Sequence, residues 1–484
     1  ELIGTAIARH PDAPAVVTGS AGSEVTHTYA DLDRRAAGLA HRLAEAGVRR
    51  GDVVALSTSR SADMVAAMWA VVASGAAFLP IDPTYPPTRI AFMLAHAAPA
   101  AVLVDATGRA ALDVPAGIPV VSIDETPAVD VALRPCAVHP LDAVSVLFTS
   151  GSTGEPKAVV GTHGALANRL AWAATQWPSD IRLAKSSLSF IDGVTELLAG
   201  LTAGATTVLA DETAARDGRT LAELVARHGA GQLLTVPSLA EALAEEHAEE
   251  LRTLRRWIVS GEALETTHLA ALRTACPDAS IVNSYGSSEV TGDVLAGEQF
   301  ADGITLGTAV PGAGIHVLDD TLTELPAGVI GEIYVSGVQL ARGYLSRPGQ
   351  TATRFVAGPD GQRLYRTGDL GARLGDGRVV YAGRADEQLK INGHRVEPAE
   401  VEAALTRLSG VREAAVVGTG STLAAFVVGD DVPAPEALLA SLARHLPRHL
   451  LPTTLIVIDA IPLLPNGKRD TTALRAMAAP TADG

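Results

Sequence analysis

The chain has 484 residues, more than one domain usually holds, and 47% of them are hydrophobic against 19% charged, so we expect at least two domains with sizeable buried cores. The formal net charge of −16 argues against a nucleic-acid partner, which would need a basic face. No apolar run approaches the roughly 18 residues of a membrane span, and no basic region precedes an apolar run near residue 1, so we expect a cytoplasmic protein without membrane contact.

Short β-branched runs alternate with amphipathic stretches through the first part of the chain. Residues 31–46 place Leu32, Ala36, Leu39 and Leu43 at a helical period. A second helix is predicted at 62–72, and buried strands are predicted at 53–56, 101–104, 120–123 and 144–148. Alternation of this kind predicts largely parallel sheets covered by helices.

The pattern changes near residue 315. Strands separated by turn-rich segments at 315–318, 331–335 and 379–381 indicate an antiparallel β subdomain. After residue 387 a compact α+β pattern follows, with helices at 398–408 and 435–445 and strands at 411–417 and 423–428. We therefore predict an α/β protein: a large N-terminal domain, 1–385, of mixed and parallel sheets with helices plus a β subdomain, joined by a hinge to a small C-terminal α+β domain, 386–484.

A polar, glycine-rich loop directly follows the predicted strand at 144–148. It reads Thr149-Ser150-Gly151-Ser152-Thr153-Gly154-Glu155-Pro156-Lys157. Gly, Ser and Thr leave backbone N–H groups and hydroxyls free to surround phosphate oxygens, and Lys157 adds positive charge. The spacing is not that of a Walker A loop. On composition alone, a flexible surface loop is the alternative interpretation.

Further segments occur along the chain in an order that carries a resemblance. They are TYADL at 28–32, GAAFLPIDP at 75–83, NSYGSSE at 283–289, GE at 331–332 with ARGYL at 341–345, YRTGDL at 365–370, GRADEQLK at 383–390 and PNGK at 465–468. With the loop at 149–157, this set resembles the adenylate-forming superfamily of acyl-CoA synthetases, luciferases and adenylation domains of nonribosomal peptide synthetases. GAAFLPIDP resembles the peptide-synthetase branch. Ala158 and Ser287 depart from the family's usual Gly and Pro, while Ser288 keeps the hydroxyl of the usual Thr.

The resemblance implies an ATP-dependent, AMP-forming reaction at named residues. The loop residues Thr149, Ser150, Gly151, Ser152, Thr153 and Gly154 would surround the phosphates with the catalytic Lys157, and Ser288 would add its hydroxyl. Glu289 would hold Mg²⁺, a hard cation suited to carboxylate oxygens. Asp369 would accept both ribose hydroxyls, Arg384 would contact ribose or phosphate, and Tyr285 would stack on adenine.

The C-terminal part would supply the second catalytic lysine and the thiol-transfer surface. By resemblance, Lys468 bridges the substrate carboxylate, the ribose oxygen and the α-phosphate in the transition state. Asp386 lies at the family's hinge position, and Gly393 lies in the loop past which the thiol arm would run. A few hinge residues that absorb a large backbone change are sufficient for such a rotation.

The acyl pocket departs from the family pattern. Relatives that activate α-amino acids carry an Asp directly after the Phe of this segment, but here Phe190 is followed by Ile191, and Asp192 falls one place later. By the same resemblance the remaining pocket positions are Thr195, Ser238, Ile258, Ser260, Ser284, Gly292 and Asp293. Two unpaired buried carboxylates are costly, so this set favours a cationic substrate.

Two interpretations of the substrate remain open. In the first, the amine is not at the α position, and Asp192 or Asp293 receives the ammonium of a β-amino or diamino acid. In the second, a backbone slip lets Asp192 take the ordinary Asp role for a small polar or basic α-amino acid. Asp192 could also face away from the pocket in a purely structural ion pair.

The leading hypothesis is an amino-acid adenylation domain that uses ATP and Mg²⁺ and passes the acyl group to the phosphopantetheine of a carrier protein. An acyl-CoA ligase is the first alternative, and a non-catalytic scaffold that binds ATP or a partner is the second. Residues 347–369 resemble the region where some relatives bind a small MbtH-like accessory protein. No carrier domain follows Lys468, so either a free-standing enzyme or an excised segment of a synthetase is expected.

Overall fold

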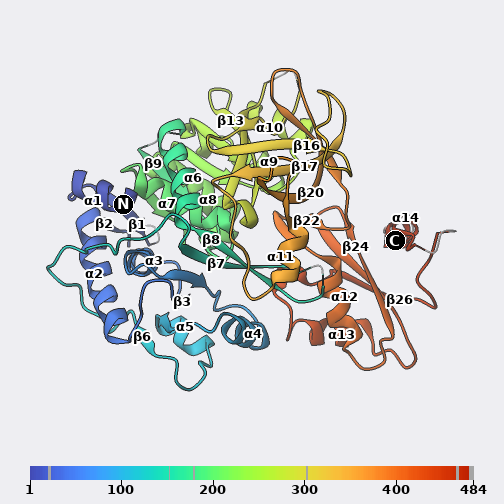
Figure 1. Ribbon diagram of the computed structural model, residues 1–484, viewed down its shortest axis with the longest axis horizontal. Coiled ribbons are helices and arrows are strands. Elements are labelled where there is room, and N and C mark those ends of the chain that lie inside the picture. Colours follow the sequence, from blue (N-terminus) through green and yellow to red (C-terminus); the bar gives the residue numbers. More distant parts are fainter. Residues whose placement is uncertain (20–22, 152, 178–179, 301–302, 465–467, 479–484) are drawn as a thin grey trace. The chain divides into compact units, whose positions relative to one another are not determined.

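The computed structural model describes the chain except for residues 20–22, 152, 178–179, 301–302, 465–467 and 479–484 (Figure 1). The chain forms two compact units. The first contains Glu1–Pro83, His96–Leu147 and Ala158–Ala385. The second contains Asp386–Gly484 together with two earlier segments, Thr84–Ala95 and Phe148–Lys157.

Two large sheets form the body of the first unit, and most of their neighbouring strands are parallel. One sheet has the order β15 (Thr308–Ala309), β14 (Gly292–Glu298), β13 (Ser280–Ser287), β12 (Arg256–Val259), β11 (Gln232–Thr235), β9 (Ile181–Ala184), β10 (Thr206–Leu209), β1 (Pro14–Thr18) and β2 (Val25–Thr28). The other has the order β18 (Gly343–Tyr344), β8 (Lys157–Thr162), β7 (Ala143–Thr149), β4 (Ala77–Pro80), β3 (Val53–Ser57), β5 (Ala101–Val104) and β6 (Val120–Ser122). Antiparallel pairs lie at the edges of these sheets, as at β1–β2, β13–β14 and β8–β18.

Helices follow the strands in alternation, as predicted for the α/β class. They are α1 (Leu2–Arg9), α2 (Tyr29–Glu45), α3 (Ala62–Ala73), α4 (Pro87–Ala97), α5 (Ala106–Ala111), α6 (His163–Gln176), α7 (Ile191–Thr202), α8 (Gly218–His228), α9 (Pro237–Glu246), α10 (Thr266–Ala275) and α11 (Pro348–Arg354). Helix α2 begins two residues before the predicted start because Thr28 and Asp31 form a capping box. Its apolar face, with Leu32, Leu39 and Leu43, is buried as the helical period predicted.

The β subdomain is antiparallel. Strands β16 (Ala313–Leu318), β17 (Gly331–Gly337), β20 (Arg363–Arg373) and β19 (Phe355–Ala357) lie side by side, and β21 (Val379–Arg384) also pairs with β20 (Figure 1). In the last pair Asp369 lies opposite Arg384. This register places two of the predicted nucleotide-site residues on neighbouring strands.

The segment 386–484 has its own apolar core. A hairpin of β22 (Leu389–Ile391) and β23 (His394–Val396) is followed by α12 (Pro398–Thr406), β24 (Glu413–Thr419), β25 (Thr422–Val428), α13 (Pro435–Leu442), β26 (Thr454–Val457) and α14 (Thr471–Ala478). Val396, Val401 and Leu442 are fully buried in its core. The α/β fold class is thereby confirmed, including an α+β pattern at the C-terminal end. A search of the described residues finds no helix of the length and hydropathy that a membrane crossing requires.

Candidate active site

Hydrogen bonds link three of the predicted nucleotide-site residues in the first unit. Tyr285 lies at the end of β13, and its hydroxyl donates to Asp369 Oδ2 at 2.6 Å. Arg384 Nη1 donates to the other carboxylate oxygen, Oδ1, also at 2.6 Å. Asp369 is only 5% exposed, so both charges of the pair are largely removed from water. Each carboxylate oxygen keeps a second lone pair for a ligand hydroxyl.

The backbone around Asp369 holds this network in place. The Asp369 N–H donates to Thr367 Oγ1, and the Thr367 hydroxyl donates to the Ile333 carbonyl on β17. Burial raises the pKa of the Tyr285 hydroxyl well above its usual value, and the adjacent Asp369 carboxylate adds to the effect. Tyr285 therefore stays a neutral hydrogen-bond donor at physiological pH.

Glu289 lies in a short 3-10 turn directly after Ser288 and is fully buried. The Tyr344 hydroxyl donates to its Oε1 at 3.0 Å. Among the described residues no group of three or more His, Cys, Asp and Glu side chains could hold a metal ion. A buried carboxylate such as that of Glu289 is a suitable oxygen ligand for Mg²⁺, a cation that proteins commonly bind through one or two carboxylates together with substrate phosphates.

The glycine-rich loop at 149–157 belongs to the second unit. Ser150 Oγ donates to the Arg395 carbonyl at 2.7 Å, and the Gly151 N–H donates to Glu400 Oε2 at 3.2 Å. A Cβ on Gly151 would lie 1.7 Å from the Glu155 carbonyl oxygen, so only glycine fits there. Lys157 begins β8 and is 5% exposed. The predicted phosphate contact Ser152 lies outside the described residues.

Glu400, on α12, also pairs with a buried arginine. Arg89 Nη1 lies 2.5 Å from Glu400 Oε1, and the two side chains are 8% and 2% exposed. Burial raises the pKa of the Glu400 carboxyl group, while Arg89 opposes that shift. One carboxylate thus holds both a guanidinium group and a backbone N–H of the loop that was predicted to hold phosphate.

The remaining predicted residues of the C-terminal part lie on exposed or turn positions. Lys468 is exposed, and Asp386 is the first residue of the second unit after Ala385. Gly393 occupies the turn of the β22–β23 hairpin with Asn392, and both residues have positive φ. An Asn-Gly pair of this kind is the preferred two-residue hairpin turn.

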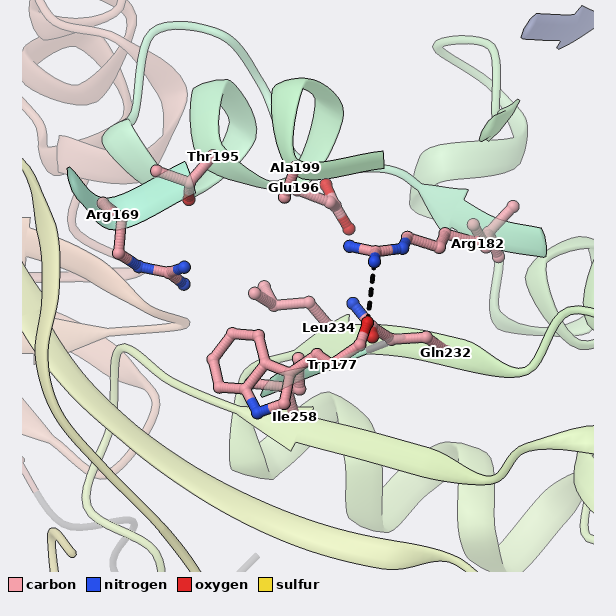
Figure 2. Close-up of a pocket in the computed structure, with 10 residues that line it drawn as sticks. Arg169, Trp177, Arg182, Thr195, Glu196, Ala199, Gln232, Leu234 and Ile258 are labelled. Atoms are coloured by element: carbon pink, nitrogen blue, oxygen red, sulfur yellow. Dashed lines mark hydrogen bonds between the residues drawn. The ribbon is translucent and has the colours of Figure 1, made fainter. Parts of the chain in front are cut away.

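A cavity in the first unit coincides with part of the predicted acyl pocket (Figure 2). Its lining includes two of the predicted positions, Thr195 on α7 and Ile258 on β12, both 1% exposed. The other lining residues come from α6, the segment after it, α7, and strands β9 and β11. They are Arg169, Trp177, Arg182, Leu183, Glu196, Ala199, Gln232 and Leu234.

The structure removes one premise of the predicted cationic substrate. Asp293 is not an unpaired carboxylate: Arg169 Nε donates to its Oδ2 at 3.1 Å, and Nη2 donates to the same oxygen. Both side chains are 2% exposed. Because the chain supplies the counter-charge for Asp293, a substrate ammonium is not needed to neutralise it.

The residues at the start of α7 differ in their helix position and in their burial. Phe190 is the N-cap residue, Ile191 is the first helical residue, and α7 continues as a regular helix to Thr202. Ile191 is 6% exposed within the main apolar cluster, whereas Asp192 is partly exposed. Asp192 is thus the second residue of α7, one position after Ile191, at which the resemblance implies an Asp.

The other predicted pocket residues surround these elements. Ser260 and Ser284 are 4% and 3% exposed, and Ser284 Oγ has no hydrogen-bond partner. Ser238 lies at the start of α9, where its N–H donates to Glu262. Gly292 begins β14, and a Cβ there would lie 3.3 Å from Thr195 Cγ2 and 3.6 Å from Arg169 Cγ.

Sequence reasoning missed Arg169, Arg182 and Gln232. Arg169 is the one arginine in the Ala-rich helix α6, and Arg182 interrupts the apolar strand β9. A charged residue at a position that periodicity assigns to the interior is the signal that could have identified them.

Comparison with known proteins places these features in a family context. Residues 4–345 match the family described as AMP-binding enzyme, and residues 400–468 match the family described as AMP-binding enzyme C-terminal domain. CymA of Salinispora arenicola, described as a probable nonribosomal peptide synthetase, is 40% identical over 96% of this chain and 6% of its own length. Tyrocidine synthase 2 of Brevibacillus parabrevis is 34% identical over 96% of this chain and 13% of its own. The chain thus spans a small fraction of these relatives.

Solved structures give the same picture for the fold. NpsA-ThdA of Klebsiella oxytoca, an artificially fused adenylation–PCP di-domain, superposes with a TM-score of 0.84 at 25% identity, covering 94% of this chain and 92% of that one. IdnL1 superposes with a TM-score of 0.83 at 29% identity, covering 95% of this chain and 98% of that one.

Proposed function

The chain belongs to the AMP-binding enzyme family, and on this premise we propose that it activates an amino acid as aminoacyl-AMP and passes it to the phosphopantetheine thiol of a carrier protein. It is an adenylation domain of the nonribosomal peptide synthetase type and an AMP-forming ligase. A carboxylate oxygen attacks the α-phosphorus of ATP, and the bond to the β-phosphate oxygen breaks as pyrophosphate leaves. Both reactants are anions, so the site must supply positive charge and fixed donors.

The Tyr285–Asp369–Arg384 network is the observation that carries this proposal. A buried carboxylate with a spare lone pair on each oxygen is suited to two adjacent ribose hydroxyls, and Arg384 supplies it with a charge-assisted hydrogen bond. Glu289 is a suitable ligand for a Mg²⁺ that also binds nucleotide phosphates, and this ion would offset their charge. We assign adenine stacking to Tyr285 and phosphate contacts to Thr149–Gly154, Ser288 and Lys157.

We assign transition-state stabilisation to Lys468 and domain rotation to a hinge at Asp386. In this assignment residues 1–385 form the core domain and 386–484 the mobile domain. The Gly-containing turn at Asn392–Gly393, in which Asn392 is exposed and Gly393 is partly buried, then serves the transfer of the acyl group to the thiol. A turn without a bulky side chain leaves room for a narrow substrate arm.

We propose that Asp192 receives the ammonium of the amino acid and that this ammonium is not at the α position. The regular geometry of α7 from Ile191 onward supports this over a backbone slip, because Ile191 keeps the position that relatives give to their Asp. Since Arg169 pairs with Asp293, one ammonium is sufficient, and a β-amino acid fits better than a diamino acid. An ordinary small polar or basic α-amino acid is the alternative.

An exchange screen separates these functions. Purified protein is incubated with ATP, Mg²⁺, labelled pyrophosphate and one acid at a time from α-amino, β-amino, diamino, aryl and fatty acids. Exchange with amino acids alone supports the proposal. Exchange with aryl or fatty acids, and product formation with coenzyme A, would indicate an acyl-CoA ligase. ATP binding without exchange for any acid would indicate a non-catalytic scaffold.

An accessory protein is a further part of the proposal. Helix α11 has no buried residue, and it lies in the region, 347–369, that resembles the MbtH-like contact of some relatives. Helix α11 thus leaves surface for a small partner. Equal solubility and exchange activity with and without such a partner would remove this part.

A further inference from the structure

Two arginine side chains converge on the cavity beneath the acyl pocket. Figure 2 shows Arg169 and Arg182 entering from opposite sides, below Thr195 and above the Trp177 ring. Both side chains are 2% exposed. Arg169 comes from α6 and Arg182 from β9, so the convergence depends on the fold and not on a local motif.

Both guanidinium groups keep donors without an acceptor. Arg182 Nη2 donates to the Trp177 carbonyl at 2.7 Å, while its Nε and Nη1 have no partner among the residues that the structure describes. Arg169 uses Nε and Nη2 on Asp293, while its Nη1 has no partner. Buried guanidinium donors without partners are costly, and a native protein rarely leaves several of them around one cavity.

The charges at this cavity do not balance. The charge of Arg169 is met by Asp293, but among the described residues no carboxylate lies within ion-pair distance of Arg182. Burial lowers the pKa of Arg182 to about 10, so it remains a cation at physiological pH. Glu196 also lines the cavity: its Oε2 accepts the N–H groups of Lys185 and Ser186, while its Oε1 has no hydrogen-bond partner among the described residues.

The cations that act most strongly on the Glu196 carboxyl group are Lys185 and Arg60. Burial raises the pKa of the Glu196 carboxyl group, and Lys185 and Arg60 oppose that shift. Gln232 adds an amide to the lining whose Oε1 has no partner. An amide turned by half a rotation presents its NH₂ group instead, which would be a further donor for an anion.

Two small residues of the predicted acyl pocket lie next to these donors. Thr195 lines both the predicted pocket and the cavity, and Gly292 leaves the Arg169 side chain uncovered. A larger residue at Gly292 would meet Thr195 and Arg169. The predicted acyl pocket and the cavity with the guanidinium groups therefore share residues.

We propose that the amino acid activated by this chain carries a second carboxylate, which binds in this cavity against Arg182 and the free Nη1 of Arg169. The inference rests on the proposed function, because the second carboxylate belongs to the substrate of that reaction. A carboxylate supplies the missing negative charge and accepts several donors at once. A second carboxylate also makes the charge of the substrate different from that of the cationic amino acid that the sequence favoured.

The test compares pairs of amino acids that differ only in this group. Pyrophosphate exchange is measured with aspartate against leucine and with β-glutamate against β-homoleucine, since a carboxylate and an isopropyl group are close in shape. We expect the dicarboxylic member of one pair to exceed its apolar partner in kcat/KM by about a hundredfold, because the apolar group leaves buried donors unpaired.

The Arg182→Met variant then identifies the group responsible. The preference within the pair is expected to fall to about threefold or less, while Arg182→Lys keeps part of it, because a cation remains. Arg256→Met is the matched control: it removes an arginine from the same sheet that does not line the cavity, and it should keep the wild-type preference.

The outcomes separate the inference from the function on which it rests. Exchange with apolar or diamino acids at least as fast as with dicarboxylic ones overturns the inference and leaves amino-acid activation standing. An unchanged preference in Arg182→Met also overturns it. Exchange with no amino acid overturns the proposed function as well. If Arg182→Met does not fold by thermal melting, the wild-type comparison within the pairs decides.

Discussion

The network of Tyr285, Asp369 and Arg384 and the cavity beside Arg182 differ in how their buried charges are neutralised. Around Asp369 every charge has a partner in the chain: Tyr285 and Arg384 each donate to one carboxylate oxygen. In the acyl cavity Arg182 has a single carbonyl acceptor, and two of its nitrogens have none. Both regions lie in the first unit, so the contrast is one between two sites of the same core.

This difference separates a preorganised site from one that a ligand completes. A matched network keeps its geometry before the ligand arrives, which lowers the cost of binding and of catalysis. An unmatched buried cation gains most when a complementary group enters, which favours selection among substrates. ATP is common to all reactions of this family, whereas the acid is specific to each member, and the two charge patterns agree with these roles.

The largest expected effect is on the chemical step and involves Lys468, which belongs to neither of the two regions compared above. Lys468→Ala should lower the exchange rate by about a thousandfold or more, while ATP affinity changes little, because the lysine acts on charge that develops in the transition state. ATP affinity is measured by equilibrium binding and the rate by exchange. Near-normal exchange in this variant would contradict the assignment of Lys468.

Breaking the matched pair of the acyl region should cost stability. Arg169→Met leaves Asp293 buried without a counter-charge, so we expect a loss of about 3–5 kcal/mol in the free energy of unfolding. The double variant Arg169→Met/Asp293→Leu should recover much of this loss in denaturant titrations. A single variant as stable as the wild type would show that the pair does not carry buried charge.

A smaller effect is expected from neutralising the nucleotide-side carboxylate. Asp369→Asn keeps the shape but weakens the bonds to Arg384 and to the ribose, so kcat/KM for ATP should fall about thirtyfold, as expected for one hydrogen bond to a charged group. Tyr285→Phe is the matched control, because it leaves the Asp369 charge in place. If both variants lose the same small amount, the charge on Asp369 does not bind the nucleotide.

The smallest effect should come from the carboxylate at the start of α7. Asp192→Ala should lower kcat/KM for the amino acid about tenfold, less than for a fully buried pair, because Asp192 is partly exposed. Saturation curves for the amino acid and for ATP separate the two effects. An unchanged substrate profile would make Asp192 a structural residue.

The fold was predictable because its signals are local, and the order of short segments along the chain predicted the nucleotide-site residues. Residues 53–56 and 101–104 were predicted as strands from short apolar runs, and β3 and β5 lie there. Asp369 and Arg384 belong to short segments whose order along the chain carries the resemblance. Strand pairing then places the two residues opposite each other, which agrees with their shared assignment to ribose.

The acyl cavity was not predictable because its pairs join distant residues. Arg169 and Asp293 stand 124 positions apart, and no spacing rule links them. The sequence therefore presented Asp293 as an unpaired carboxylate and favoured a cationic substrate. The same reason hid the contact between Arg89 and Glu400, which stand 311 positions apart. Charge balance inside a core depends on tertiary contacts. The sequence position of one charged residue therefore does not identify the residue with which it pairs.

Isotope transfer from the acid to AMP tests acyl-AMP formation most directly. The amino acid is labelled with heavy oxygen in both carboxylate oxygens, and the reaction is completed with a thiol acceptor. One labelled oxygen should appear in the phosphate of AMP and one in the acyl product, because the carboxylate attacks the α-phosphorus and AMP leaves with that oxygen. AMP without label, or label in inorganic phosphate, would contradict the account.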